Sequence, residues 1–272
     1  GVVAWDDQVK GRIEIANAEM DDFIIARADG TPTYNFCVVV DDWDMRITHV
    51  LRGDDHVNNT PRQINVLRAL GAEVPLYGHL SMILGDDGTK LSKRHGAVSV
   101  MQYDEDGYLP EAVINYLARL GWSHGDDEFF TTDQMVEWFS LEALNKGAAR
   151  FDFVKLENIN GHYIREADPG YLYEVMVDTA KEVGRDEDAK GLMANHNTVM
   201  AALPELQPRA KTVLELIDLA QFIYALRPIQ PDEKAAALLT DEARVVLASV
   251  ADTLGGLADW SVPSIDAAMR AL

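Results

Sequence analysis

Short apolar runs in the opening third of the chain predict β-strands joined by turns. The first thirty residues alternate between strand-like segments and polar turns, and Asp29-Gly30 predicts a tight turn. The run YNFCVVV (34–40) is continuously apolar, which predicts a strand covered on both faces of a parallel sheet. A second strand is predicted over RITHVLRG (46–53), and it leads into a cluster of charged residues.

A helix is predicted directly after this second strand. Thr60 fits its N-cap, Pro61 its first helical position and Gln63 the capping-box position. Gly71 fits its end. The apolar stripe between these signals is formed by Ile64, Leu67 and Leu70. A strand, a charged turn and a capped helix together predict one βα unit of a doubly wound α/β sheet.

Polar residues after that strand are the first candidates for a binding site. Ligands of doubly wound sheets bind at the carboxyl ends of the strands. The residues at this end are Arg52, Asp54, Asp55 and His56. A solvated turn would carry the same residues, so the pattern alone leaves both interpretations open.

After residue 96 the apolar positions recur at helical spacing. Caps and stops bound five such segments, which cover residues 109–122, 131–144, 167–184, 213–226 and 241–257. We therefore predict an α/β half followed by an all-α half, with two helical bundles joined near READPG (165–170). The aromatic side chains of this half, including Trp122 and Trp138, are predicted to be core residues.

Composition narrows the class of protein. The 272 residues are 47% hydrophobic, enough for two or three domains with their own cores. No run of about 18 apolar residues predicts a membrane span, and the N-terminus lacks the pattern of a secretion signal. The single cysteine, Cys37, excludes a disulfide framework and is predicted to be a buried, inert thiol. These features predict a cytoplasmic protein with no membrane partner.

The chain is strongly acidic overall but contains one basic stretch. The formal net charge of −21 argues against general nucleic-acid binding, so any nucleic acid must be met by local patches. The stretch DDGTKLSKRHG (86–96) nevertheless collects Lys90, Lys93, Arg94 and His95. Its glycines predict a loop, and cations on a loop beside an α/β sheet suit a polyphosphate. It matches neither a Walker loop nor G-x-G-x-x-G, and a solvated basic turn remains the alternative.

Three successive blocks of sequence carry a resemblance to a known family. KLSKR (90–94) resembles the KMSKS signature loop of class I aminoacyl-tRNA synthetases, with Leu for Met and Arg for the last Ser. With PTYNFCVVVDDWDMRITHVLRGDDHVNNTPRQI before it and GYLPEAVINYLARLGWS after it, the chain is similar to the catalytic and stem-contact regions of bacterial glutamyl-tRNA synthetases. The resemblance is dense over residues 1–165 and looser beyond.

The resemblance implies a domain organisation. Residues 1–96 would be the second half of a doubly wound, Rossmann-like catalytic domain, with the end of its insertion at 1–30. Residues 97–168 would be a helical stem-contact region, and residues 169–272 an incomplete helical anticodon-binding region. The HIGH-like tetrapeptide of class I synthetases is absent, so we expect the chain to be a portion of a longer enzyme. If it were the whole molecule, we would expect no aminoacylation.

The resemblance also implies an activity and its partners. The family activates L-glutamate with ATP to glutamyl-adenylate and transfers it to the 3′ end of tRNA(Glu). Mg²⁺ is expected to accompany ATP. The residues support no zinc site, because the seven histidines are scattered and the cysteine is alone. We expect a monomer, and the sequence leaves open whether glutamine tRNA is also charged.

Roles carry over by position. The residues implied to act on the ATP phosphates are Lys90, Lys93 and Arg94, with ATP contacts from Leu91, Ser92, Asp55 and His56. The glutamate pocket is implied to be formed by Tyr34, Val38 and Arg52. A guanidinium fork suits a carboxylate, because it donates two parallel hydrogen bonds. For tRNA contact, the first basic residues to test are Arg209 and Lys211, although two solvated charges at a helix start would look the same.

Three other functions remain as alternatives. A glutamyl-queuosine-type paralogue lacks an anticodon domain, and the long helical tail disfavours it. A glutaminyl-tRNA synthetase fits HGAVSV and PTYNFCVVVDDWDM less well. A degenerate, non-catalytic tRNA-binding module is favoured by the missing HIGH region and disfavoured by the lysines of the loop.

Overall fold

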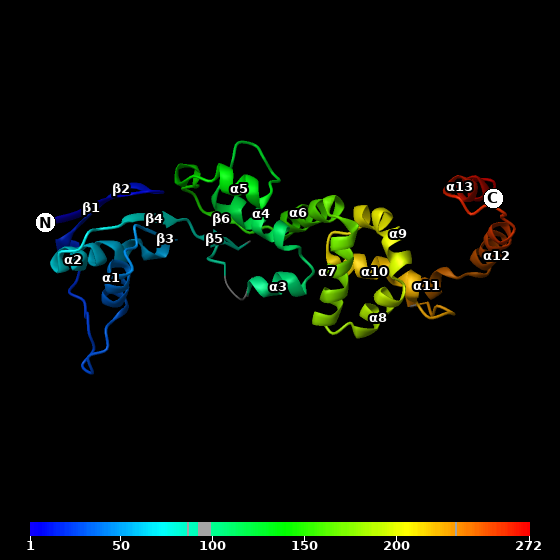
Figure 1. Cartoon of the computed structure of the whole chain (residues 1–272), viewed down its shortest axis with the longest axis horizontal. Helices are drawn as coiled ribbons and strands as arrows, with labels where there is room; N and C mark the ends of the chain where they lie inside the picture. Colours follow the sequence, from blue (N-terminus) through cyan, green and yellow to red (C-terminus); the bar gives the residue numbers. More distant parts are fainter. Residues whose placement is uncertain (86, 92–98, 232) are drawn as a thin grey trace. The chain divides into compact units, whose positions relative to one another are not determined.

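A computed structural model describes residues 1–85, 87–91, 99–231 and 233–272. The chain divides into two compact units, Gly1–Tyr224 and Ala225–Leu272. The α/β part of the first unit contains β1 (Val2–Asp7), β2 (Gly11–Ala16), α1 (Tyr34–Asp44), β3 (His49–Gly53), the 3₁₀-helix η2 (Asp54–Asn59), α2 (Thr60–Leu70) and β4 (Leu76–Leu80) (Figure 1). β1 and β2 form an antiparallel hairpin.

The predicted βα unit is present. β3 and β4 are parallel neighbours, and α2 connects them. Their register places Arg52 opposite His79. α2 begins at Thr60 with Pro61 in its first turn, and it ends at Gly71, whose φ of 73° is the left-handed conformation that glycine adopts without strain.

The predicted capping at the start of α2 is wrong in detail. Asn59 occupies the N-cap position, and no side chain caps the helix. The Gln63 amide instead donates to Asn35 Oδ1 of α1 at 3.0 Å. The side chains predicted to cap the helix therefore serve contacts with neighbouring elements.

The run YNFCVVV is a helix rather than the predicted strand. It forms most of α1, and only Val39 of this helix is buried, at 1% exposure. Continuous apolar runs do not distinguish a strand from a helix, and here the packing of α1 on α2 decides for the helix. Cys37 is consequently exposed, not buried, and its thiol lies 3.6 Å from Asp41 Oδ2 one turn later. The charge of Asp41 raises the pKa of the Cys37 thiol.

Helices fill the remainder of the first unit. They are α3 (Val100–Glu105), α4 (Pro110–Gly121), α5 (Thr132–Trp138), α6 (Phe153–Glu166), α7 (Pro169–Glu182), α8 (Asp186–Ala194), α9 (His196–Leu206) and α10 (Val213–Tyr224). Two short parallel strands, β5 (Ile83–Leu84) and β6 (Ala149–Arg150), join this part. The predicted helices at 109–122, 167–184 and 213–226 are confirmed, whereas 131–144 is helical only in its first half, followed by a single 3₁₀ turn.

One hydrophobic core runs through these helices. Leu156 and Ile164 of α6 belong to the same buried cluster as Leu172 and Met176 of α7, so the packing is continuous across the predicted join. The domain boundaries at 96 and 168 stay a prediction. Trp122 is buried as predicted, at 2% exposure, whereas Trp138 is half-buried and stacks on His124.

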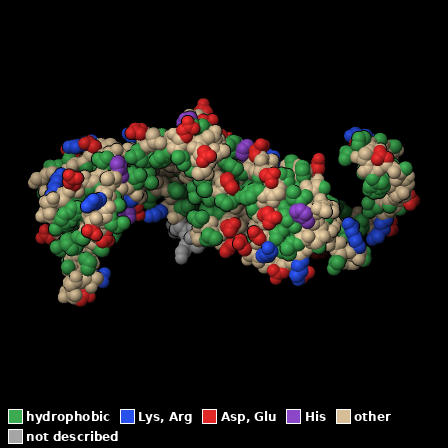
Figure 2. Space-filling model, viewed as in Figure 1, with side chains coloured by type: hydrophobic (Ala, Val, Ile, Leu, Met, Phe, Trp, Pro, Cys, Tyr) green, Lys and Arg blue, Asp and Glu red, His purple; other side chains and the backbone are tan. Residues whose placement is uncertain are grey.

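The second unit consists of α11 (Glu233–Leu238), α12 (Asp241–Gly255) and α13 (Val262–Arg270). α12 confirms the helix predicted at 241–257, and it packs against α13. In neither unit is any described helix long and apolar enough to cross a membrane. On the face drawn in Figure 2, acidic side chains gather over α3 and α7.

Gly107, between α3 and α4, gives a test of the helical packing. Its φ is 82°, and an added Cβ would lie 2.9 Å from the backbone nitrogen of Leu214. Gly184 has a similar φ of 75° with open space around it. We expect Gly107→Ala to lower the free energy of local unfolding by roughly 2–5 kcal/mol, and Gly184→Ala by only about 1–2 kcal/mol. Native-state hydrogen exchange of the core amides measures both, and equal losses would contradict this packing.

Candidate active site

Arg52 is held at the carboxyl end of β3 by hydrogen bonds to two side chains. Its Nη2 donates to Thr60 Oγ1 at 2.8 Å, and its Nε donates to His79 Nε2 at 3.3 Å. Its Cζ lies 5.4 Å from the centroid of the Tyr77 ring. These two bonds use two of the five N–H donors of the guanidinium, and the other three have no hydrogen bond to the described part of the chain.

A buried carboxylate supports His79 from the other side. The side chains of Asp7 and His79 are both fully buried, and Asp7 Oδ2 accepts a short hydrogen bond from His79 Nδ1. Burial opposes ionisation of Asp7, but hydrogen bonds from Lys10, His79 and Val9 outweigh it and lower its pKa. The sequence interpretation missed this pair, although a histidine within the apolar strand LYGHL was a signal for it.

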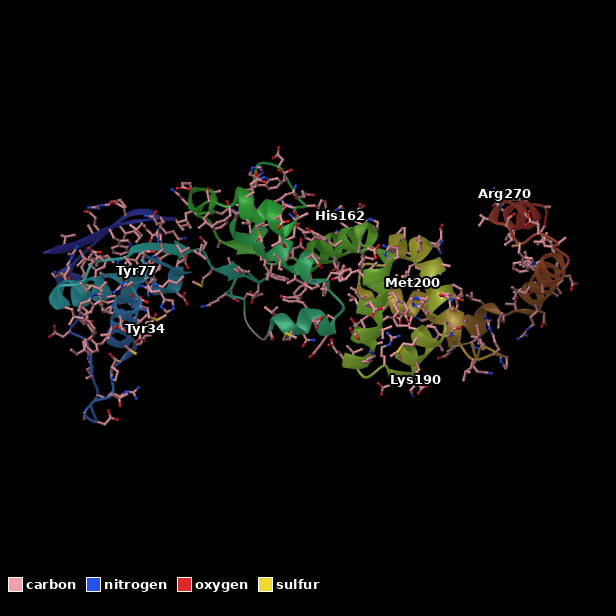
Figure 3. The ribbon with its side chains drawn as sticks, viewed as in Figure 1. Tyr34, Tyr77, His162, Lys190, Met200 and Arg270 are labelled. Atoms are coloured by element: carbon pink, nitrogen blue, oxygen red, sulfur yellow. The ribbon has the colours of Figure 1, made fainter. Side chains whose placement is uncertain are left out.

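α1 supplies the residues opposite Arg52. Tyr34, Val38 and Asp42 share one helix face at spacings of four residues. The Tyr34 hydroxyl lies 3.4 Å from His56 Nδ1. Tyr34 on α1 and Tyr77 on β4 belong to the same part of the molecule (Figure 3).

Charged groups of α1 and β3 act on the Tyr77 hydroxyl. Burial raises the pKa of Tyr77 to about 12, with the charge of Arg52 opposing the rise and the charges of Asp42 and Tyr34 adding to it. Burial also raises the pKa of Asp42, against the attraction of Arg52. The structure therefore brings the sequence-predicted Tyr34, Arg52 and His56 together.

Residues 87–91 of the cationic loop are described. Gly85 N donates to Thr89 O at 2.8 Å and Leu91 N to Ile83 O at 2.9 Å, so residues 90–91 return alongside β5 as a small hairpin. Lys90 Nζ lies 2.7 Å from Asp55 Oδ2, with both side chains substantially exposed (60% and 40%). The hydrogen bond from Lys90 lowers the pKa of Asp55. The predicted phosphate contacts Ser92, Lys93 and Arg94 lie outside the described residues, and Leu91 packs against the helical core.

Lys10, in the turn between β1 and β2, contacts three separate segments, and it was not identified from the sequence. Its Nζ donates to Ser81 Oγ at 2.6 Å and to Lys146 O at 3.0 Å. It also lies 3.1 Å from Asp54 Oδ2, and Asp54 neighbours the Asp55 that binds Lys90. The other oxygen of Asp54 is buried with no hydrogen-bond partner among the described residues.

The predicted tRNA contacts lie far along the chain from this site. Arg209 is exposed at the end of a 3₁₀ turn, and Lys211 lies 3.8 Å from Glu157 Oε2. Their role stays a prediction. Among the described residues, no group of three or more His, Cys, Asp or Glu side chains is arranged to hold a metal ion.

Comparison with known families decides the relationship. Residues 1–158 match the catalytic domain of class I tRNA synthetases (E and Q), and residues 172–272 match an anticodon binding domain. The chain belongs to this class I synthetase family.

Relatives of this synthetase chain are close in sequence and structure. It is 60% identical over 270 residues to the glutamate–tRNA ligase of Aromatoleum aromaticum, covering 99% of the chain and 56% of that protein. It is 56% identical over 272 residues to the glutamate–tRNA ligase of Paraburkholderia phytofirmans, covering 100% and 57%. A solved glutamate tRNA ligase from Elizabethkingia meningosepticum, in complex with its amino acid, matches with a TM-score of 0.79 at 26% identity, over 100% of the chain and 56% of that one. The chain thus spans a little more than half the length of these relatives.

The Lys90–Asp55 pair predicts a pKa change. Because the pKa of Asp55 is lower in the folded state, its ionised carboxylate stabilises the fold at pH values above its unfolded-state pKa. That stabilisation is lost as the pH falls through the folded-state pKa. Lys90→Met should therefore raise the pKa of Asp55 toward its ordinary value of 3.8. Carboxyl-detected NMR titration measures it, with Lys190→Met, which removes a similar exposed pair with Glu187, as the matched control. An unchanged Asp55 pKa would show that the pair does not form in solution.

Proposed function

We propose that this chain is the part of a glutamate–tRNA ligase that selects glutamate and contacts tRNA(Glu). The observation that carries the proposal is the half-buried Arg52 at the carboxyl end of a parallel strand, where three of its N–H donors have no hydrogen bond to the described part of the chain. The family and the relatives support it, and the whole enzyme would use the same residues.

The chemistry follows in two steps. An oxygen of the glutamate α-carboxylate attacks the α-phosphorus of Mg·ATP, the bond to the β-phosphate bridge breaks, and pyrophosphate leaves with its electron pair. The terminal ribose hydroxyl of tRNA(Glu) then attacks the acyl carbon, loses its proton, and AMP leaves. Neither step needs a side-chain nucleophile, so alignment and charge stabilisation supply the rate. We assign Arg52 and Tyr34 to the glutamate side chain, with Val38 as a pocket wall.

The remaining residues serve the phosphates and the tRNA in this proposal. Lys90 leaves Asp55 to follow the triphosphate together with Lys93 and Arg94, and His56 binds ATP or the amino acid. Residues 97–168 contact the acceptor stem, with Arg209 and Lys211 toward the anticodon arm. The enzyme acts as a monomer in the cytoplasm.

Specificity for glutamate over glutamine follows from the guanidinium. A carboxylate accepts from both arms of the fork, whereas a carboxamide must turn its NH₂ group toward one N–H donor. One buried donor is then left unpaired, which is unfavourable by about 1–3 kcal/mol.

Exchange of labelled pyrophosphate into ATP tests the function. The full-length protein should catalyse exchange with glutamate in the presence of tRNA(Glu), and glutamine should be a poor substitute. Exchange that prefers glutamine would identify the glutaminyl branch. No exchange with either amino acid would favour a non-catalytic tRNA-binding module.

Arg52→Gln tests the assigned pocket. The variant removes the charged fork, so kcat/KM for glutamate should fall roughly 10²–10³-fold, while KM for ATP stays within about twofold. Arg68→Gln, an exposed arginine on α2, is the matched control. Equal damage to glutamate and ATP use would mean that the pocket lies elsewhere.

A further inference from the structure

We propose that His79 is a positioning residue for Arg52: Asp7 fixes it as the neutral Nδ1–H tautomer, so that Nε2 accepts from the guanidinium and fixes which edge of Arg52 faces the substrate. The inference rests on the proposed function, in which Arg52 binds the glutamate side-chain carboxylate. His79 itself touches no substrate, because its side chain is fully buried.

The hydrogen position on His79 is set from two independent directions. Asp7 Oδ2 accepts from Trp5 Nε1 at 3.2 Å and also contacts His79 Nδ1. Because an ionised carboxylate can only accept, the proton of the Asp7–His79 bond belongs to His79 Nδ1. On the opposite side, Arg52 Nε can only donate, so His79 Nε2 must be unprotonated to receive it at 3.3 Å. A proton on both nitrogens would set an imidazolium against a guanidinium.

Thr60 completes the arrangement. Its side chain is fully buried, and Oγ1 accepts from Arg52 Nη2 while lying 3.0 Å from His79 Nε2. Its single hydroxyl hydrogen is then free to point to His79 or to the His56 carbonyl oxygen at 3.4 Å. Both acceptors of Arg52 are therefore buried and neutral.

These hydrogen bonds determine which edge of the Arg52 guanidinium is free for a ligand. Nε and Nη2 form the lateral edge of a guanidinium, and His79 and Thr60 occupy it. The Nη1/Nη2 end remains for a two-bond interaction with a carboxylate. Because both acceptors are buried, the orientation exists before glutamate binds, and binding loses less conformational entropy.

The two oxygens of Asp7 have different partners, so a variant of Asp7 can test the positioning role of His79 apart from a structural role. Oδ1 accepts three backbone N–H groups, from Val9 at 3.1 Å, Lys10 at 2.9 Å and His79 at 3.0 Å. Oδ2 faces only the side chains of Trp5 and His79. Asp7→Asn with its carbonyl at the Oδ1 position keeps the backbone bonds and puts an NH₂ group against His79 Nδ1, while the Trp5 N–H loses its acceptor. The proton of His79 then moves to Nε2 and points at Arg52.

Steady-state pyrophosphate exchange by the full-length protein with tRNA(Glu) tests the inference. Asp7→Asn should raise KM for glutamate roughly 10–100-fold, with kcat and KM for ATP within about threefold. Asp6→Asn, on the same strand and exposed, is the matched control and should leave all three unchanged. His79→Leu should raise KM for glutamate as Asp7→Asn does, and His79→Gln, which keeps an acceptor, should recover part of the loss. The double variant Asp7→Asn/His79→Leu should have nearly the same KM for glutamate as His79→Leu alone.

Each outcome separates the hypotheses. Glutamate-dependent exchange by the wild type, with Asp7→Asn and His79→Leu both matching Asp6→Asn, would overturn the role of His79 and leave the proposed function standing. A parallel fall in every parameter, with no recovery by His79→Gln, would reduce the pair to a structural contact. No exchange by the wild type would overturn the proposed function and this inference with it. Should Asp7→Asn not fold, the comparison of His79→Gln with His79→Leu decides.

Discussion

The hydrogen bonding of the Arg52 guanidinium is the constraint on which the proposed site depends. A half-buried guanidinium must be hydrogen-bonded, and the usual partner is a carboxylate that also cancels its charge. Here the two partners are His79 and Thr60, which accept hydrogen bonds without adding negative charge. Arg52 is thereby hydrogen-bonded by neighbouring side chains, and the charge of Asp42 on α1 attracts it without a hydrogen bond between them among the described residues. The nearest fixed carboxylate of this relay, Asp7, is separated from Arg52 by the imidazole of His79.

The fold assembles this constraint from segments far apart in the sequence. The β3–β4 register sets Arg52 against His79, the start of α2 supplies Thr60, and the end of β1 supplies Asp7. Lys10, three residues after Asp7, links the same region to Ser81, two residues before β5, and to Asp54, next to the Asp55 that pairs with Lys90. The β1–β2 hairpin therefore contacts both the strand residue His79, which accepts from Arg52, and Ser81, which precedes the hairpin that carries Lys90, although neither of its strands carries a residue of the resemblance-based site.

The sequence predicted the parts of this arrangement that depend on local patterns. The βα rule placed Arg52 and His56 at a strand end, and helix signals placed Gly71 at the end of α2 and its start within one residue. The run around Cys37 was assigned to a strand because apolar continuity carries no period, and only its packing on α2 shows that it is a helix. The Asp7–His79 pair spans 72 residues, and no local rule connects such positions. A buried strand histidine needs a partner, but only the packing of β1 against β4 identifies which one.

The tautomer of His79 tests the account most directly. Long-range ¹H–¹⁵N correlation NMR of the folded, full-length protein distinguishes a protonated Nδ1 from a protonated Nε2 through the two nitrogen shifts. The account predicts a neutral ring with its proton on Nδ1 and a bare Nε2. A proton on Nε2 would leave Arg52 without its second acceptor and would contradict the account.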